Sequence, residues 1–139
     1  MSSTTGKCLC GQISVSVSKE VLSATDNITL CHCKNCRQSG GALASVSVIA
    51  PESTVKISGV PKIYQDVNTD SGKPLERAFC GNCGSPIYTA SPNVPGIQVI
   101  KLGLFDEIPK PGMESYCKAR PPWDKPVDNA KQFNTMPTK

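Results

Sequence analysis

The chain has 139 residues, a formal net charge of +4, a hydrophobic fraction of 38% and an aromatic fraction of 5%. This length favours one domain over residues 1–139. Charges of both signs are mixed along the chain without a dense basic run, which argues against nucleic-acid binding. No segment approaches the roughly 18 apolar residues that would span a membrane, and the start is polar. We therefore expect a cytoplasmic protein in a reducing compartment.

The first predicted strand covers residues 12–18, where Ile13, Val15 and Val17 alternate with polar side chains. This period of two is typical of a strand with one buried face. Residues 33–40 are predicted to form a knuckle with about one helical turn. Further strands are predicted at residues 28–30, 43–49, 54–57, 62–67, 75–79, 87–89 and 97–102.

After residue 106, six prolines leave room only for short pieces of regular structure. The pattern predicts a mainly β single domain of short antiparallel strands. We expect its core at about residues 6–125, followed by a Pro-rich C-terminal tail.

Seven of the eight cysteines lie in closely spaced groups. These are Cys8 and Cys10, then Cys31, Cys33 and Cys36, and finally Cys80 and Cys83. Clustered thiols in a reducing compartment bind metal more often than they form disulfides. Disulfides are the alternative, because eight is an even number, but a ring closed between near neighbours would be strained.

Two distant thiol pairs can complete one zinc site. A C-x-x-C pair on a tight turn, such as Cys80 and Cys83, supplies half of the four ligands that structural zinc takes. The remaining pair, Cys8 and Cys10, is the natural source of the other half. Such a site would join the start of the chain to the middle of the domain.

The central group then has three thiols, Cys31, Cys33 and Cys36, which is one too few for a closed shell. Three protein ligands with one open position are typical of catalytic zinc. Two alternatives would close the shell instead: Cys117 as a fourth ligand, or His32 from within the motif.

Three ordered motifs carry a family resemblance: C-x-C-G-x-I at residues 8–13, C-H-C-x-x-C-R at residues 31–37, and F-C-x-x-C-G-S at residues 79–85. At these residues the chain resembles the glutathione-dependent formaldehyde-activating enzyme (Gfa) family, also called the CENP-V/GFA domain. The resemblance covers roughly residues 6–125 and implies an Mss4-like fold stapled by zinc knuckles.

The resemblance implies two Zn²⁺ sites, with glutathione as co-substrate. Cys8, Cys10, Cys80 and Cys83 would hold a structural ion, and Cys31, Cys33 and Cys36 a catalytic one. The implied reaction makes or breaks a carbon–sulfur bond, as in the synthesis of S-hydroxymethylglutathione. Members nearest to that activity have Trp-Lys after the third central cysteine, whereas this chain has Arg37-Gln38. This difference favours another glutathione-linked thioether or thiohemiacetal over formaldehyde.

Four further residues are candidates for binding glutathione. The planar guanidinium of Arg37 can pair with a carboxylate, or it can cap local carbonyls. Gly40 and Gly41 can let backbone amides approach a ligand, or can simply turn the chain. Trp123 is expected either as an aromatic wall over the site or as a core plug for the tail.

The sequence thus predicts a zinc-dependent carbon–sulfur lyase that acts on glutathione or its adducts. The alternative is a non-catalytic, zinc-stabilised binding module of Mss4-like fold. The expected partners are a small-molecule glutathione conjugate or an aldehyde, without nucleic acid or membrane, and a homodimer is one assembly left open.

Overall fold

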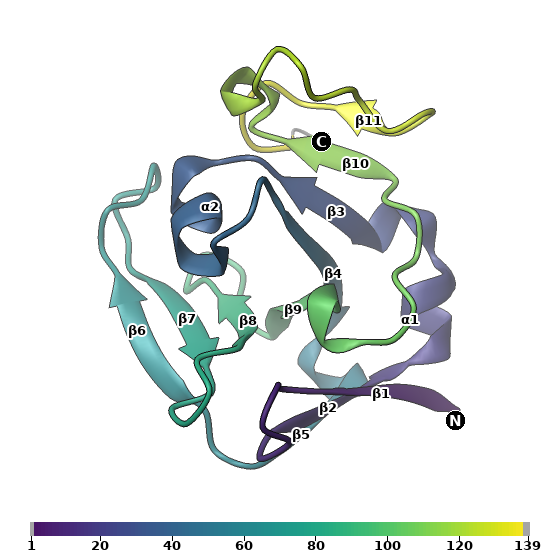
Figure 1. Ribbon diagram of the computed structural model, residues 1–139, viewed down its shortest axis with the longest axis vertical. Coiled ribbons are helices and arrows are strands. Elements are labelled where there is room, and N and C mark those ends of the chain that lie inside the picture. The colour runs from purple at the N-terminus through teal and green to yellow at the C-terminus, as the bar shows by residue number, and fades with distance from the viewer. Residues whose placement is uncertain (1, 138–139) are drawn as a thin grey trace.

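The computed structural model describes residues 2–137 and divides its strands between two sheets (Figure 1). The smaller sheet has the order β1 (Ser3–Lys7), β2 (Ser14–Ser18) and β5 (Val55–Ser58), all antiparallel. It lies at the bottom of Figure 1, beside the N-terminus.

The larger sheet has eight strands and spans the rest of the molecule. In spatial order they are β11 (Lys131–Gln132), β10 (Met113–Ser115), β3 (Ile28–Cys31), β4 (Ser45–Pro51), β9 (Ile97–Lys101), β8 (Pro86–Ala90), β7 (Leu75–Phe79) and β6 (Lys62–Asp66). The helical elements are α1 (Lys19–Ser23), α2 (Lys34–Gly40) and the 3₁₀ turns η1 (Thr25–Asn27), η2 (Glu52–Thr54), η3 (Leu102–Leu104) and η4 (Cys117–Ala119). The prediction of a mainly β fold is confirmed. No helix within residues 2–137 is long and apolar enough to cross a bilayer.

The hydrophobic core lies where the two sheets meet. Ile13, Val15 and Val17, predicted to face inward, are at most 2% exposed. They belong to one buried cluster with Val48 and Ile100 of the large sheet. Alternate side chains of a strand point to opposite faces. One face of the large sheet therefore packs against this core.

The opposite face of the large sheet carries a row of polar side chains, here called the polar face. Cross-strand pairing places them on the same side: Thr29 and Cys31 on β3, Ser45 and Ser47 on β4, Lys101 on β9, Thr89 on β8 and Arg77 on β7. Four of them are buried: Thr29, Ser47, Thr89 and Arg77. Helix α2 sits between β3 and β7 in Figure 1. Arg77 of the polar face donates to Ser39 of α2, so α2 packs against this face.

The two ends of the chain differ from the sequence expectation. Residues 3–7 form an edge strand despite their polar side chains, because main-chain bonding to β2 needs no apolar pattern. Strand β10 pairs in parallel with both β3 and β11, whereas only antiparallel pairs were expected. The segment after residue 125 was expected to be a Pro-rich tail. Instead, its backbone forms hydrogen bonds with β10. For example, Phe133 N donates to Glu114 O at 2.9 Å.

Candidate metal centres

The first candidate centre joins two thiol pairs that are 70 residues apart. The sulfurs of Cys8, Cys10, Cys80 and Cys83 all lie within 4.8 Å of one another. The Sγ atoms of Cys8 and Cys10 are 3.6 Å apart, and those of Cys10 and Cys80 are 3.7 Å apart. A tetrahedron with Zn–S bonds of about 2.3 Å has sulfur–sulfur edges of about 3.8 Å. These four residues therefore fit a zinc ion.

Backbone amides support the sulfurs of this centre. Ile13 N donates to Cys8 Sγ at 3.3 Å, and Cys83 N donates to Cys80 Sγ at 3.5 Å. The Ser85 hydroxyl lies 3.3 Å from Cys83 Sγ, and hydrogen bonds from Ser85 lower the pKa of Cys83 to about 5. Donors to sulfur favour thiolates, which are the form that binds metal.

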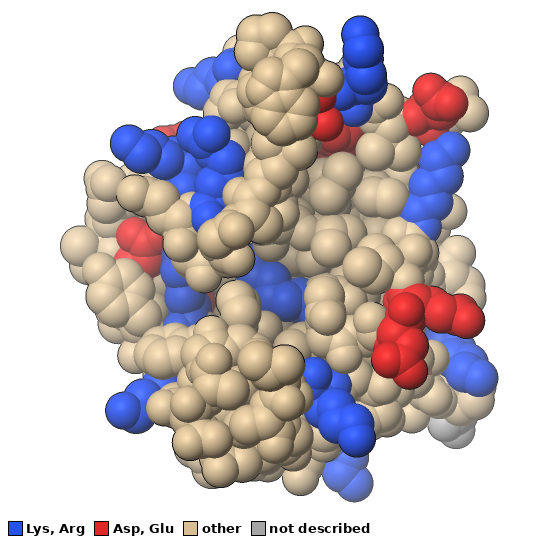
Figure 2. Space-filling model, in the orientation of Figure 1, with Lys and Arg blue, Asp and Glu red and all other residues tan. Residues whose placement is uncertain are grey.

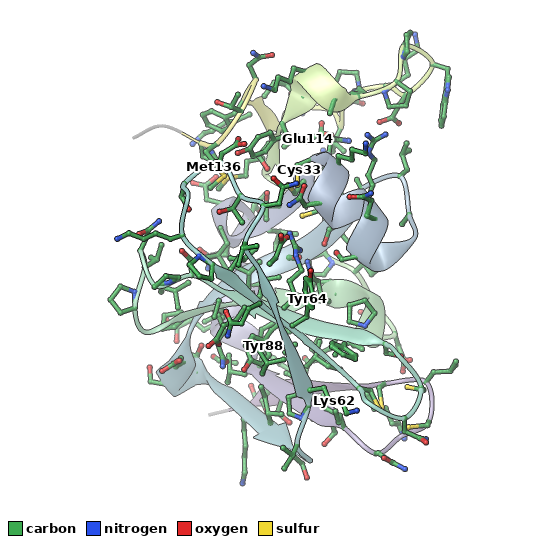
Figure 3. The ribbon with its side chains drawn as sticks, turned by 90° about the vertical axis from the view of Figure 1, so that its left-hand side faces the viewer. Cys33, Lys62, Tyr64, Tyr88, Glu114 and Met136 are labelled. Carbon is green, nitrogen blue, oxygen red and sulfur yellow. The ribbon has the colours of Figure 1, made fainter. Side chains whose placement is uncertain are left out.

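The second candidate centre lies where β3 ends and α2 begins. The sulfurs of Cys31, Cys33 and Cys36 lie within 4.8 Å of one another. Cys33 is the N-cap of α2, and its Sγ accepts a hydrogen bond from Cys36 N at 3.3 Å. Figure 3 shows sulfur atoms gathered in two separate places, one of them beside the labelled Cys33. The two centres are therefore distinct.

The pKa values of the three central thiols depend on one another. Hydrogen bonds from Cys31 and Cys33, and then the charges of Lys101 and Arg77, lower the pKa of Cys36 to about 2. Hydrogen bonding to Cys33 and Cys36, together with burial, raises the pKa of Cys31. One thiolate thus suppresses ionisation of its neighbours. A divalent cation would allow all three to ionise, so this donor set also fits zinc.

Polar contacts dock α2 against the large sheet. Asn35 Nδ2 donates to Asp66 Oδ2 at 3.0 Å and to Asn68 O at 2.7 Å. The same carboxylate oxygen accepts from Arg77 Nε at 2.8 Å, and Arg77 also donates to Ser39 Oγ at 3.4 Å. Arg77 and Asp66 are both buried. Their ion pair therefore fixes the helix that carries Cys36 above the polar face.

A lysine from β9 also lies on the polar face near the second centre. Lys101 Nζ donates to Ser45 Oγ at 2.7 Å, and Ser45 is the cross-strand partner of Cys31. Burial lowers the pKa of Lys101, while the nearby Cys36 opposes that shift. The hydrogen bond to Ser45 therefore places the ammonium group on the face of the sheet that carries Cys31.

A buried carboxylate holds the loop between Cys31 and Cys33 from its other side. Glu114 Oε1 accepts from His32 Nε2 at 2.8 Å and from Arg120 at 2.6 Å. Its Oε2 accepts from Val127 N at 2.8 Å and from Gln132 Nε2 at 2.6 Å. Although burial raises the pKa of Glu114, these four hydrogen bonds lower it to about 2. Figure 3 shows Glu114 close to Cys33.

Comparison with known proteins identifies the family of this chain. Residues 3–119 match the family described as glutathione-dependent formaldehyde-activating enzyme (GFA). The chain belongs to this family. An uncharacterized lyase of Schizosaccharomyces pombe is 26% identical over 106 residues, which cover 74% of this chain and 69% of that protein. A crystal structure of a Rhodobacter sphaeroides protein has the same fold, with a TM-score of 0.56 and 19% identity over 76% of this chain and 97% of the other.

In this GFA-family chain, neither alternative closing ligand reaches the three-cysteine group. All eight cysteines are free thiols. Cys117 Sγ instead lies 3.3 Å from Gln132 Oε1, outside both cysteine groups. His32 Nε2 donates a hydrogen bond to Glu114 Oε1, because an ionised carboxylate can only accept. This nitrogen is therefore occupied. His32 Nδ1 is buried without a hydrogen-bond partner among the described residues.

The four residues expected to bind glutathione are scattered around α2 and the C-terminal segment. Arg37 is half-buried on α2, and its Nε is buried without a hydrogen-bond partner among residues 2–137. Gly40 ends α2, and Gly41 caps it with φ +62°. Trp123 is 72% exposed on a turn, so it is not a plug for the core. Their role toward glutathione stays a prediction.

Sequence reasoning missed three charged residues around the second centre. Lys101 and Arg77 lie within strands whose exposed and buried faces cannot be told apart from the residue pattern alone. Glu114 stands in a stretch without periodicity, between two prolines and a cysteine. In the GFA-family chain, long-range strand pairing brings all three to the cysteines.

Proposed function

We propose that this protein is a cytoplasmic, zinc-dependent carbon–sulfur lyase that acts on glutathione or glutathione adducts. The observation that carries the proposal is the division of seven thiols into one set of four and one separate set of three. Membership of the GFA family and similarity to a protein named as a lyase support an enzymatic role.

Cys31, Cys33 and Cys36 would hold the catalytic ion, and Cys8, Cys10, Cys80 and Cys83 the structural one. When bound by three protein ligands, zinc supplies a Lewis acid and an open position for a substrate sulfur or oxygen. The chain's own groups orient this site. The amide of Cys36 bonds to Cys33 Sγ, and the Asp66–Arg77 pair holds α2 in place.

Cobalt substitution tests whether the second centre takes a substrate thiol. Protein purified in zinc should contain close to two ions per chain. In the cobalt form, glutathione should change the visible absorption of the ion held by Cys31, Cys33 and Cys36. The matched variant Cys33→Ser should lose that response while it retains the four-cysteine ion. Two closed sites that do not respond to glutathione would instead favour the non-catalytic binding module.

Product analysis tests the reaction itself. The protein should be mixed with glutathione and a panel of small aldehydes, including formaldehyde, and the adducts followed by mass spectrometry. We expect faster formation or breakdown of at least one thiohemiacetal than in buffer, and no acceleration with Cys33→Ser. Equal rates for both proteins across the panel would contradict the proposal.

A further inference from the structure

The most unusual feature of the second centre is a positive charge without a carboxylate partner. Within residues 2–137, no carboxylate oxygen lies within 4.0 Å of Lys101 Nζ. The nearby Arg77 is different, because its Nε lies 2.8 Å from Asp66 Oδ2. Lysine side chains that are half-buried usually reach water or a partner. The ammonium group of Lys101 has a neutral partner, the hydroxyl of Ser45, to which it donates at 2.7 Å.

The strand register fixes where this charge lies. Cys31 on β3 pairs with Ser45 on β4, and Lys101 on β9 pairs with Ser47 on β4. All four side chains therefore share the polar face. Cβ atoms of cross-strand partners are about 5 Å apart, and Lys101 Nζ is 2.7 Å from Ser45 Oγ. The charge thus lies within the span of one small ligand from the sulfur of Cys31.

The molecular surface carries positive charge within a hollow. Figure 2 shows a hollow near the middle of the visible surface, with Lys or Arg side chains inside it. Because Lys101 shares the polar face with Cys31, a ligand that enters at the three thiols would meet a cation on one side.

We propose that Lys101, oriented by Ser45, binds an anionic oxygen of the ligand that the three-cysteine centre takes. The ligand class is a small thiol or thiol adduct whose carboxylate or developing alkoxide lies a few bonds from its sulfur. Lys101 donates to that oxygen through Nζ, and Arg77 adds positive potential without leaving Asp66. A charge-assisted bond of this kind is stronger than one between neutral groups. This inference rests on the proposed function, because the ligand is one that carries sulfur.

A competing explanation is that Lys101 only balances the charge of the three thiolates. The two explanations differ in what the lysine charge controls. If it balances the thiolates, its removal should release the metal from this centre. If it binds the ligand, its removal should leave the metal in place and change which ligands bind.

A pair of thiols that differ in charge but not in size provides the test. Mercaptoacetate and 2-mercaptoacetamide have the same number of heavy atoms, and only the first is anionic. Each is titrated into the cobalt-substituted protein, and the dissociation constant is read from the visible absorption. We expect mercaptoacetate to bind at least about tenfold more tightly than the amide. In Lys101→Met this ratio should fall to about one, with cobalt content unchanged.

Matched variants test whether the charge of Lys101 causes the preference for mercaptoacetate. Lys101→Arg should keep most of the preference, because it keeps the charge. Lys56→Met, which removes an exposed lysine of the small sheet, should keep all of it. If Lys101→Met does not fold, Ser45→Ala serves instead and should reduce the preference by loosening the ammonium group.

Four results would overturn the inference. Equal affinity of the native protein for both thiols would do so while the proposed function stands. A preference that survives in Lys101→Met, or in Ser45→Ala where that variant replaces it, would assign the effect to another group. Loss of cobalt from the three-cysteine centre in Lys101→Met would show that the lysine balances the thiolates. No response to glutathione or to either probe would remove the proposed function, and this inference with it.

Discussion

At the scale of single residues, the second centre depends on side chains that do not themselves bind metal. Glu114 accepts four hydrogen bonds, and one of these comes from His32, between two of the cysteines. Asp66 similarly accepts from both Asn35 and Arg77. Each of these carboxylates therefore couples a cysteine-bearing segment to a distant strand.

Glu114→Gln should destabilise the protein in a pH-dependent way. The folded-state pKa of about 2 lies below the ordinary value of 4.5. A depression of this size corresponds to about 3 kcal/mol at neutral pH. The stabilisation is fully present above about pH 4.5 and is lost as the pH falls towards 2. Urea unfolding of the native protein and the variant should therefore differ at pH 7 and converge in acid. A difference that does not change with pH would contradict this account.

Asp66→Ala should be more damaging than removal of an exposed carboxylate. It leaves the buried Arg77 unpaired, and breaking a buried pair by removing one partner costs about 3–5 kcal/mol. It also removes an acceptor for Asn35 on α2. Urea unfolding would measure the loss, with Asp106→Ala as a control at an exposed position. Equal stability of the two variants would mean that Arg77 finds another partner.

At the scale of elements, the parallel pairing of β10 with β3 brings the C-terminal segment to the loop that carries Cys31, His32 and Cys33. Register places Glu114 beside Leu30 and Ser115 beside Cys31. His32 N then donates to Ser115 O at 3.1 Å. His32 and Glu114 are more than 80 residues apart in the sequence. The rest of the fold is therefore needed to bring them together.

Gly112→Ala tests this pairing. A Cβ at Gly112 would collide with the carbonyl group of Thr25, at a position where Gly112 N also donates to Ile28 O at 2.9 Å. Strand β10 would have to shift, at a cost of about 1–3 kcal/mol. The melting temperature should fall, and the three-cysteine centre should bind cobalt more weakly. Gly103→Ala is the control, because nothing lies within 4 Å of its added Cβ. Identical behaviour of the two variants would contradict the structural role of β10.

At the scale of the whole molecule, the two centres should contribute differently to stability. The four-cysteine centre joins the turn before β2 to the turn between β7 and β8. The three-cysteine centre lies within one continuous stretch of six residues. An ion that joins distant segments constrains the unfolded chain more than one that joins near neighbours.

Cys80→Ser should therefore unfold the domain, whereas Cys33→Ser should leave it folded. Structural zinc contributes about 10–16 kcal/mol of apparent binding energy in zinc-finger peptides, and folding depends on it there. Circular dichroism during thermal melting would separate the variants, and metal analysis would show which ion each retains. A similar collapse of both would contradict the division into a structural and a catalytic centre.

The sequence by itself predicted which cysteines group together in the two candidate centres. Cysteine spacing alone separated Cys8, Cys10, Cys80 and Cys83 from the central three, and alternating apolar residues located most strands. Both signals are local, because C-x-C and C-x-x-C turns and a period of two are set by neighbouring residues.

Only the tertiary structure decided which charges surround the central thiols. Lys101, Arg77 and Glu114 reach them through strand pairs that bring together residues far apart in the chain, and Cys117 is kept away by the same C-terminal segment. The face to which a charged side chain points depends on the register of its strand. That register is fixed by the packing of the whole domain and not by the residues next to the charge.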